Sequence, residues 1–302
     1  MASQIIECVP NISEGRRSEV LEEVKGALER TAGLKLLGMS PDGSHNRTVI
    51  TLAGDADALL AGLEELYAVT LKHVDLRSHT GEHPRLGAVD VVPFIPIRNA
   101  TTEECVELAK KAGSIIWEKF RVPVYLYEDA ASRPDRKELP AIRKGQFEGL
   151  AEKMKDPAWA PDFGTPEPHP SAGASVVGAR PPLIAYNINL GTNRVEVADR
   201  IAKAIRHIGG GYRFVRAMGV ALEDRGLVQV SINMVNYKKS PLFRVFETVK
   251  REAQRYGVNV VSSEIVGLVP EDALLETADY FLQLESFDPS QVLERKIAEL
   301  EQ

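Results

Sequence analysis

LKLLGMSPDGSHNRTVITL, residues 34–52, is the stretch that decides the fold. It contains two short apolar runs, at 34–39 and 48–52, on either side of the turn-forming SPDGS at 40–44. Apolar runs of this length, bounded by Pro, Asp, Gly and Ser, are typical of consecutive strands. We therefore predict a strand, a turn and a second strand here.

A helix is predicted on each side of this pair of strands. Residues 18–28 and 55–74 carry apolar side chains at helical spacing, and Ser18 is the expected N-cap of the first helix. Short apolar runs at 5–9 and 88–97 predict one strand before the first helix and one after the second. The resulting order is β-α-β-β-α-β, the ferredoxin-like pattern. A helix at 102–120 and a strand at 122–127 extend it.

The same order of elements is predicted again in the second half of the chain. Its elements are, in order, a strand at 183–190, a helix capped by Asn193, strands at 215–222 and 227–234, a helix at 241–256 and a strand at 258–261. The intervening segment at 156–175 is rich in Pro, Gly and Asp, as is typical of a join between domains. We therefore predict an α+β protein of two tandem ferredoxin-like (βαββαβ) two-layer α/β sandwich subdomains, at 1–178 and 179–302.

Composition limits the class of protein. The chain has 302 residues, 44% of them apolar, and a net charge of −6, which argues against a general nucleic-acid binder. The longest apolar run, at 91–97, is far shorter than the ~20 residues of a membrane span. Cys8 and Cys105 lie far apart without metal-like spacing, and residues 1–15 do not resemble a signal peptide. We therefore expect two buried, reduced thiols in a cytoplasmic protein without nucleic-acid or membrane partners.

Ionisable residues are concentrated in RSHTGEHPRLG, residues 77–87, directly before the strand at 88–97. This density of charge at the entrance to a strand is typical of a site on a rigid scaffold, although a solvated loop remains the alternative. HTGEH at 79–83 also fits the H-x-x-E-H pattern of a group of zinc peptidases. That pattern requires a helix, which Gly81 and Pro84 disfavour, so no metal site is expected here.

Without a metal, the segment predicts acid–base chemistry. A histidine with an unperturbed pKa near 6.5 both accepts and returns a proton at neutral pH, and His83 lies between Glu82 and Arg85. Arg77 and Arg85 could bind carboxylates through bidentate hydrogen bonds. The residues therefore predict acid–base catalysis on a substrate that bears carboxylates, without identifying that substrate.

A series of motifs covers nearly the whole chain. They are ECVPNISEG (7–15), NRTV (46–49), GEHPRLGAVD (81–90), PFIP (93–96), VPVYLY (122–127), LPAIR (139–143), WAPDFG (159–164), NINL (187–190) and VGLVP (266–270). In this order and at this spacing they resemble the glutamate formimidoyltransferases, a match far more specific than any single motif. The animal members continue into a cyclodeaminase domain, and we expect this chain to correspond to the transferase alone.

The resemblance implies an activity. It implies transfer of the formimidoyl group of N-formimidoyl-L-glutamate to N5 of tetrahydrofolate, a co-substrate of one-carbon metabolism, as part of histidine breakdown. It also implies a homodimer. The histidine of the G-E-H-P-R motif, His83 here, would be the acid–base catalyst, and the arginines would face the carboxylates of glutamate and of the folate tail.

The resemblance also implies binding residues. The folate segment maps to Gly164, Thr165, Pro166, Glu167, Pro168, His169, Pro170, Ser171, Ala172 and Gly173, with Ala172 where animal members carry an aromatic ring. The candidates for substrate binding are Asp42, Arg47, Arg77, Glu82, Arg85 and Tyr127. A plain interdomain linker remains the alternative for the first set, a turn residue for Asp42 and a satisfied buried hydroxyl for Tyr127.

Other functions fit the same residues. A transferase that moves the formyl group of 5-formyltetrahydrofolate to glutamate would use the same folate, glutamate and proton shuttle. A folate-binding protein without turnover and a zinc hydrolase built on His79 and His83 are alternatives of other classes. The sequence does not separate the two transferases.

Overall fold

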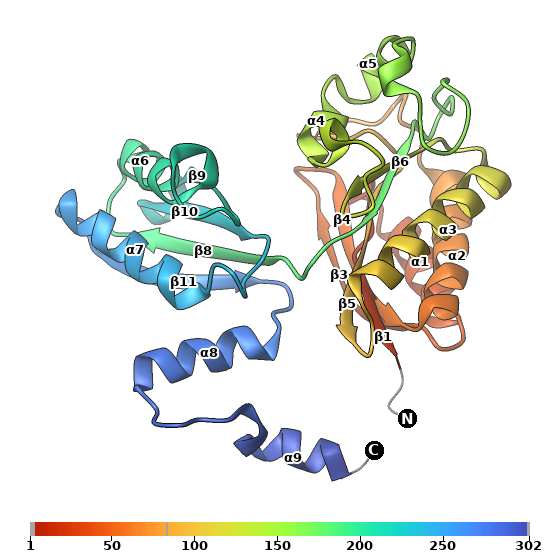
Figure 1. Ribbon diagram of the computed structural model, residues 1–302. Helices are drawn as coiled ribbons and strands as arrows, with labels where there is room; N and C mark the ends of the chain where they lie inside the picture. The colour runs from red at the N-terminus through yellow and green to blue at the C-terminus, as the bar shows by residue number, and fades with distance from the viewer. Residues whose placement is uncertain (1–3, 83, 301–302) are drawn as a thin grey trace. The chain divides into compact units, whose positions relative to one another are not determined.

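The structure, a computed structural model, describes residues 4–82 and 84–300 (Figure 1). The chain divides into two compact units, Met1–Arg180 and Pro181–Gln302, each built around its own sheet. The protein is therefore of the α+β class. The Pro- and Gly-rich segment at 156–175, expected to join the domains, lies inside the first unit. Among the described residues, no helix has both the length and the apolar character needed to cross a membrane.

Unit 1 contains the predicted β-α-β-β-α-β elements and additional ones. They are β1 (Ile5–Cys8), β2 (Asn11–Ile12), α1 (Ser18–Glu29), β3 (Lys35–Asp42), β4 (Arg47–Gly54), α2 (Ala56–His73), β5 (Val89–Arg98), α3 (Thr102–Phe120), β6 (Val124–Glu128), α4 (Leu139–Arg143), α5 (Gln146–Lys153) and β7 (Ser175–Ala179). The predicted N-cap was wrong by one residue. Helix α1 begins at Ser18 with Arg17 at the N-cap, and the Glu14 carboxylate accepts the backbone N–H groups of Arg16 and Arg17, each at 2.9 Å.

The sheet of unit 1 has the strand order β3-β4-β1-β5-β7-β6. The short strand β2 also lies between β4 and β5 and pairs with both, as β1 does. Strands β1 to β5 pair antiparallel, whereas β7 lies parallel between β5 and β6. Strand β7 was not predicted. Its five residues directly follow a segment rich in turn-forming residues, and their partners lie more than 45 residues away in sequence.

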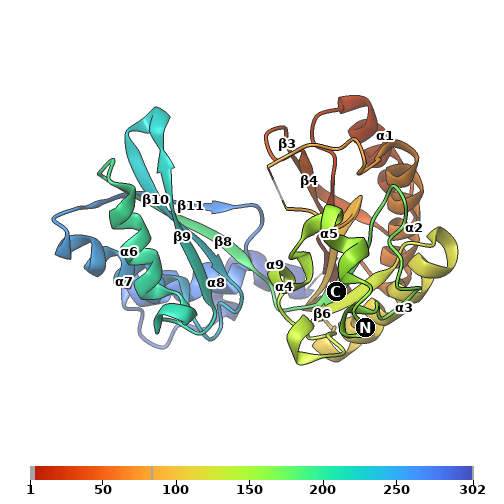
Figure 2. The same ribbon diagram turned by 90° about the horizontal axis from the view of Figure 1, so that it is seen from above.

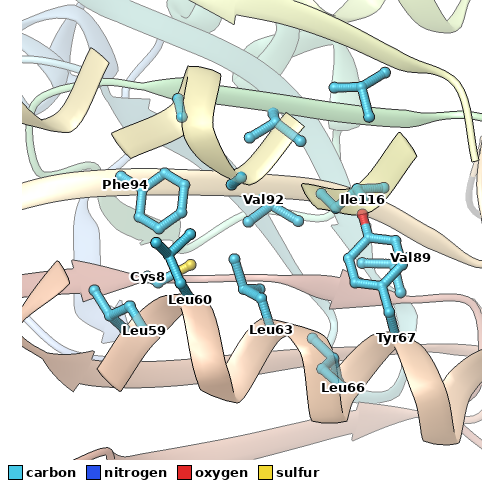
Figure 3. Close-up of a cluster of buried hydrophobic side chains, with 14 of the residues drawn as sticks. Cys8, Leu59, Leu60, Leu63, Leu66, Tyr67, Val89, Val92, Phe94 and Ile116 are labelled. Carbon is cyan, nitrogen blue, oxygen red and sulfur yellow. The ribbon is translucent and has the colours of Figure 1, made fainter. Parts of the chain in front are cut away.

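The main core of unit 1 lies between one face of this sheet and helices α1 to α3 (Figure 3). Leu60 and Leu63 of α2 point toward Phe94 and Val92 of β5, and Tyr67 of α2 lies beside Val89. Cys8 and Cys105 are free and buried, as predicted, and burial raises the pKa of both thiols.

Unit 2 has a sheet in the order β11-β8-β10-β9, in which every neighbouring pair is antiparallel. Its elements are β8 (Ile184–Leu190), α6 (Val195–Ile205), β9 (Val215–Leu222), β10 (Leu227–Met234), α7 (Leu242–Arg255), β11 (Val260–Val266), α8 (Glu271–Leu282) and α9 (Leu293–Leu300). Helices α6 and α7 lie on one face of this sheet (Figure 2). Arg194, not Asn193, occupies the N-cap of α6.

Candidate active site

Segments of unit 1 that are distant in sequence meet in one hydrogen-bonded group of loops. We call it the loop cluster. It consists of residues 13–17 before α1, 42–48 at the β3–β4 turn, 78–82 and 84–90 leading into β5, 143–148 from the end of α4 to the start of α5, and 171–174 before β7. The residues at 78–82 and 84–90 are hydrogen-bonded to each of the other segments, so the rest of the cluster is arranged around the charged loop that the sequence singled out.

The β3–β4 turn holds the first part of that loop. Asn46 has a left-handed backbone with a φ of 48°, and its side chain bridges two segments. Its Oδ1 accepts the N–H of Gly15 at 3.0 Å, and its Nδ2 donates to the carbonyl of Thr80 at 2.9 Å. Gly81 lies so close to the turn that a Cβ there would clash with the backbone oxygen of His45. The loop is therefore held against the β3–β4 turn by a close backbone contact that requires glycine at position 81.

His79 is held in one tautomer. The Nε atom of Arg85 donates to His79 Nδ1 at 3.0 Å, so the opposite nitrogen, Nε2, carries the proton and donates to the Asn46 carbonyl at 3.0 Å. Burial, the largest cause, lowers the pKa of His79, and the nearby Arg85 charge adds to the effect. Arg85 in turn forms a bidentate pair with the Glu148 carboxylate at 2.8 and 3.2 Å.

This arrangement argues against the zinc alternative. Both ring nitrogens of His79 are already bonded to protein groups, and residues 79–82 and 84–88 are not helical. The described residues of the motif therefore do not form the helix that the zinc pattern needs. Within residues 4–82 and 84–300, no three His, Cys, Asp or Glu side chains are grouped as metal ligands.

Asp90 organises the turn that follows the loop. Its buried carboxylate accepts the backbone N–H groups of Leu86 at 2.6 Å and Gly87 at 3.1 Å, and it forms an ion pair with Arg143 of α4. The guanidinium of Arg47 lies near both charged groups of this pair. Burial, followed by repulsion from Arg143, lowers the pKa of Arg47. Two arginines therefore share one buried carboxylate just beyond the charged loop.

The end of the predicted folate segment pairs directly with the same turn. The N–H of Ala88 donates to the carbonyl of Ala172 at 3.0 Å, and the N–H of Ala174 donates to the carbonyl of Leu86 at 3.2 Å. Gly173 has a φ of 69°, and a Cβ there would clash with the Leu86 oxygen. The tertiary structure therefore joins the two predicted functional segments through their backbones.

Two family models match the chain. "Formiminotransferase domain, N-terminal subdomain" covers residues 5–180, and "Formiminotransferase domain" covers residues 185–298. The chain belongs to the formiminotransferase family.

Curated relatives agree with this membership. The chain is 48% identical to the "Glutamate formimidoyltransferase" of Streptococcus pyogenes, over 98% of this chain and 99% of the relative. It is 46% identical to the protein of the same name in Thermoplasma acidophilum, over 97% of each chain. It is also 44% identical to the "Formimidoyltransferase-cyclodeaminase" of Rattus norvegicus, over 94% of this chain and 53% of the relative. The resemblance inferred from the motifs is thus confirmed.

The structure brings most of the predicted substrate-binding residues of this family member into the loop cluster. Asp42 lies at the end of β3 and accepts the backbone N–H and the ring Nδ1 of His45, each at 2.8 Å; these bonds lower the pKa of Asp42. Arg47 and Arg85 are described above, and the N–H of Glu82 donates to the Ser44 carbonyl at 3.3 Å. His83, the predicted catalytic residue, lies outside the described residues.

The remaining predicted binding residues are placed differently. Arg77 is exposed and pairs with Asp75, and Tyr127 is buried on β6, where burial raises the pKa of its hydroxyl to about 12. In the folate segment, residues 164–167 are exposed, whereas Ala172 packs into the core of unit 1. His169 closes the intervening turn, because its Nδ1 accepts the N–H of Ala172 at 3.0 Å.

Sequence reasoning missed the residues that hold the cluster together. Asn46, Asp90 and Arg143 all lie within the motifs that carry the family resemblance, so a signal for their importance existed. Their partners could not be read from it, because Asp90 and Arg143 are 53 residues apart. Glu148, the partner of Arg85, lies in no motif at all.

Two surface cavities lie elsewhere in the molecule. One, of about 500 Å³, is lined by α1 and β3, and the other, of about 550 Å³, is lined by α7 and β11. Neither is lined by the described residues of the charged loop at 77–87. Hydrogen bonds and concentrated charge, and not a large cavity, therefore distinguish the loop cluster.

The lowered pKa of His79 should make the stability of the protein depend on pH. Its folded-state pKa is lowered, so the folded protein binds fewer protons than the unfolded chain and loses stability as the pH falls below the unfolded value near 6.5. We expect His79→Gln to lose less free energy of unfolding between pH 7.5 and 5.5 than the unaltered protein. Urea unfolding at both pH values measures this, and equal losses in the two proteins would contradict it.

Proposed function

We propose that this chain is a glutamate formimidoyltransferase that transfers the formimidoyl group of N-formimidoyl-L-glutamate to N5 of tetrahydrofolate. Its family membership supports this, as do the printed names of two relatives that match it over nearly their full length. The observation that carries the proposal is the backbone pairing of residues 86–88 with 172–174. It joins the segment that contains His83 to the segment predicted to bind folate.

The reaction needs one proton to leave and one to enter. N5 of the folate attacks the amidine carbon and forms a tetrahedral intermediate, in which the new C–N5 bond and the old C–N bond to glutamate coexist. We infer that His83 accepts the proton from N5 and then returns it to the glutamate nitrogen as the C–N bond breaks. Glutamate leaves with its carboxylates intact, and the formimidoyl group remains on the folate.

Arginines of the loop cluster would bind the carboxylates. Arg47 is the strongest of the predicted candidates, because its half-buried guanidinium lies beside a second arginine, Arg143, at the edge of the charged loop. Arg85 is hydrogen-bonded to His79 and paired with Glu148, so we assign it the role of positioning the loop that contains His83. Asp42 and Glu82 border the same loop and are exposed enough to meet a substrate.

We also infer the finer architecture and assembly. The sheet orders β3-β4-β1-β5 and β9-β10-β8-β11 both place the first strand of a β-α-β-β-α-β set between its third and fourth. This supports one ferredoxin-like repeat in each of the two units, with the predicted boundary at 178/179 moved beyond the end of β7. The homodimer is proposed from the family resemblance alone, and sedimentation of the purified chain at micromolar concentration tests the dimer.

The test of the activity compares two substrate pairs. We expect kcat/KM for N-formimidoyl-L-glutamate with tetrahydrofolate to exceed that for 5-formyltetrahydrofolate with glutamate. A larger value for the second pair would favour the formyltransferase. Binding of folate without turnover of either pair would indicate a folate-binding protein, and inhibition by a chelator together with stoichiometric zinc would point to a metal enzyme.

A further inference from the structure

The turn between α4 and α5 supplies side chains that hold the last part of the charged loop. We call this turn, residues 143–148, the α4–α5 corner (Figure 1). At its start Arg143 pairs with Asp90, and at its end Glu148 pairs with Arg85. The shape of the corner therefore decides where both of these loop residues are held.

The corner has little support of its own. Helix α4 contains only five residues, and the last four carbonyls of a helix have no partners within it. Gly145 and Gln146 then both adopt left-handed backbone, with φ values of 91° and 54°. This conformation is unfavourable for glutamine, because glutamine carries a Cβ. Contacts from outside the corner must therefore keep it in this shape.

Lys153, in the last turn of α5, provides such contacts. Its Nζ donates to the carbonyls of Ala141 at 2.9 Å, Ile142 at 2.6 Å and Lys144 at 3.3 Å. An ammonium has three N–H donors, which matches these three acceptors. Burial, the largest cause, lowers the pKa of Lys153 to about 8, so the ammonium form still predominates at pH 7. One side chain thus connects the end of α5 to the end of α4.

An aromatic ring also holds this ammonium. The Nζ atom of Lys153 lies 3.7 Å from the centroid of the Trp159 ring, and the face of a tryptophan attracts a cation. Trp159 is itself held in place. Its side chain packs against a buried cluster, and its carbonyl accepts the hydroxyl of Tyr125 at 2.6 Å. The carbonyls and the ring together fix the position of Nζ.

A lysine that only serves the surface of its own helix has different contacts. Lys155, two residues further on, pairs with Glu152 of α5, and its side chain is 71% exposed. Lys153 is partly buried, and its Nζ donates to carbonyls of α4 and of the residue that follows α4. The bonds of Lys153 therefore support the corner and not helix α5.

We propose that Lys153 is a positioning residue of the transfer reaction. By connecting the ends of α4 and α5 it holds the α4–α5 corner, and through the corner it orients the loop that contains His83. This inference rests on the proposed function, because that loop is where we place the proton transfers. Lys153 acts through the loop and not on the substrate.

Replacement of Lys153 tests the proposal. Lys153→Met keeps an unbranched apolar chain beside Trp159 but removes the charge and all three donors. We expect kcat at pH 7 for N-formimidoyl-L-glutamate with tetrahydrofolate to fall about 10- to 100-fold, because a misplacement of about 1 Å caused far from the chemistry costs up to about 100-fold. The Kd for 5-formyltetrahydrofolate should stay nearly unchanged, since the corner lies outside the predicted folate segment. Urea unfolding measures the folded fraction of each variant under the assay conditions.

Three further variants make the test specific. Lys153→Arg retains the charge and several N–H donors, so it should restore most of the lost kcat. Lys155→Met removes an exposed lysine of the same segment and should leave kcat unchanged. If Lys153→Met does not fold, Lys153→Gln, which keeps two N–H donors, takes its place with a smaller expected fall in kcat.

Each outcome bears on the proposal. A folded Lys153→Met or Lys153→Gln with the kcat of the unaltered protein would overturn it, because Lys153 would then support stability alone. Equal losses of kcat and of folate affinity would also overturn it, as would a Lys153→Arg that is as slow as Lys153→Met. If the unaltered protein transfers only the formyl group of 5-formyltetrahydrofolate, the proposed function fails, and the same variants assayed with that substrate pair still test Lys153. If the unaltered protein turns over neither pair, both fail.

Discussion

His83→Ala is expected to lower kcat by a factor on the order of 10²–10⁴ while folate still binds, because general acid–base catalysis contributes about that much. Both proton transfers would then depend on water. Steady-state kinetics with N-formimidoyl-L-glutamate and tetrahydrofolate measures kcat, and equilibrium binding of 5-formyltetrahydrofolate measures the affinity. Added imidazole should restore part of the lost turnover, since it replaces the missing proton carrier.

Two other histidines serve as controls for this change. His207→Ala alters an exposed histidine of unit 2 and should leave kcat unchanged. His79→Gln alters a residue whose ring nitrogens are both bonded within the loop cluster, so it should reduce stability at neutral pH without a defect that imidazole repairs. Turnover near that of the unaltered protein in His83→Ala would contradict the assignment of His83.

Loss of Asp90 should have the largest effect on stability. Asp90→Ala leaves the guanidinium of Arg143 without its carboxylate and leaves the N–H groups of Leu86 and Gly87 without an acceptor. Removing one partner of a buried ion pair costs about 3–5 kcal/mol. We expect a loss of that size in the free energy of unfolding, measured with urea, together with a loss of transferase activity.

An exposed aspartate provides the matched control for Asp90. Asp135 also pairs with an arginine, Arg133, but both side chains are about half exposed. Water screens such a pair, so Asp135→Ala should leave the free energy of unfolding nearly unchanged. If the two alanine variants were equally stable, the buried Asp90–Arg143 pair would not be the support that we assign to it.

Local sequence patterns predicted most of the secondary structure. The apolar runs at 34–39 and 48–52 became β3 and β4, and the strands at 215–222 and 227–234 were placed to the residue. The spacing of apolar side chains predicts these helices and strands because each of them must bury one face. Strand β7 escaped prediction because its residues directly follow turn-forming ones and its pairing with β5 and β6 is not local.

The sequence by itself determined the family, the order of the elements and the loop that contains His79, Glu82 and Arg85, because motifs and periodicity are properties of neighbouring residues. Only the tertiary structure decided what those residues do. In the folded protein, His79 accepts a hydrogen bond from Arg85, and Arg85 forms an ion pair with Glu148. The tertiary structure also pairs residues 86–88 with 172–174, which are more than 80 residues apart. A hydrogen bond forms only between atoms that are close in space, and the number of residues between two positions does not give their distance in space.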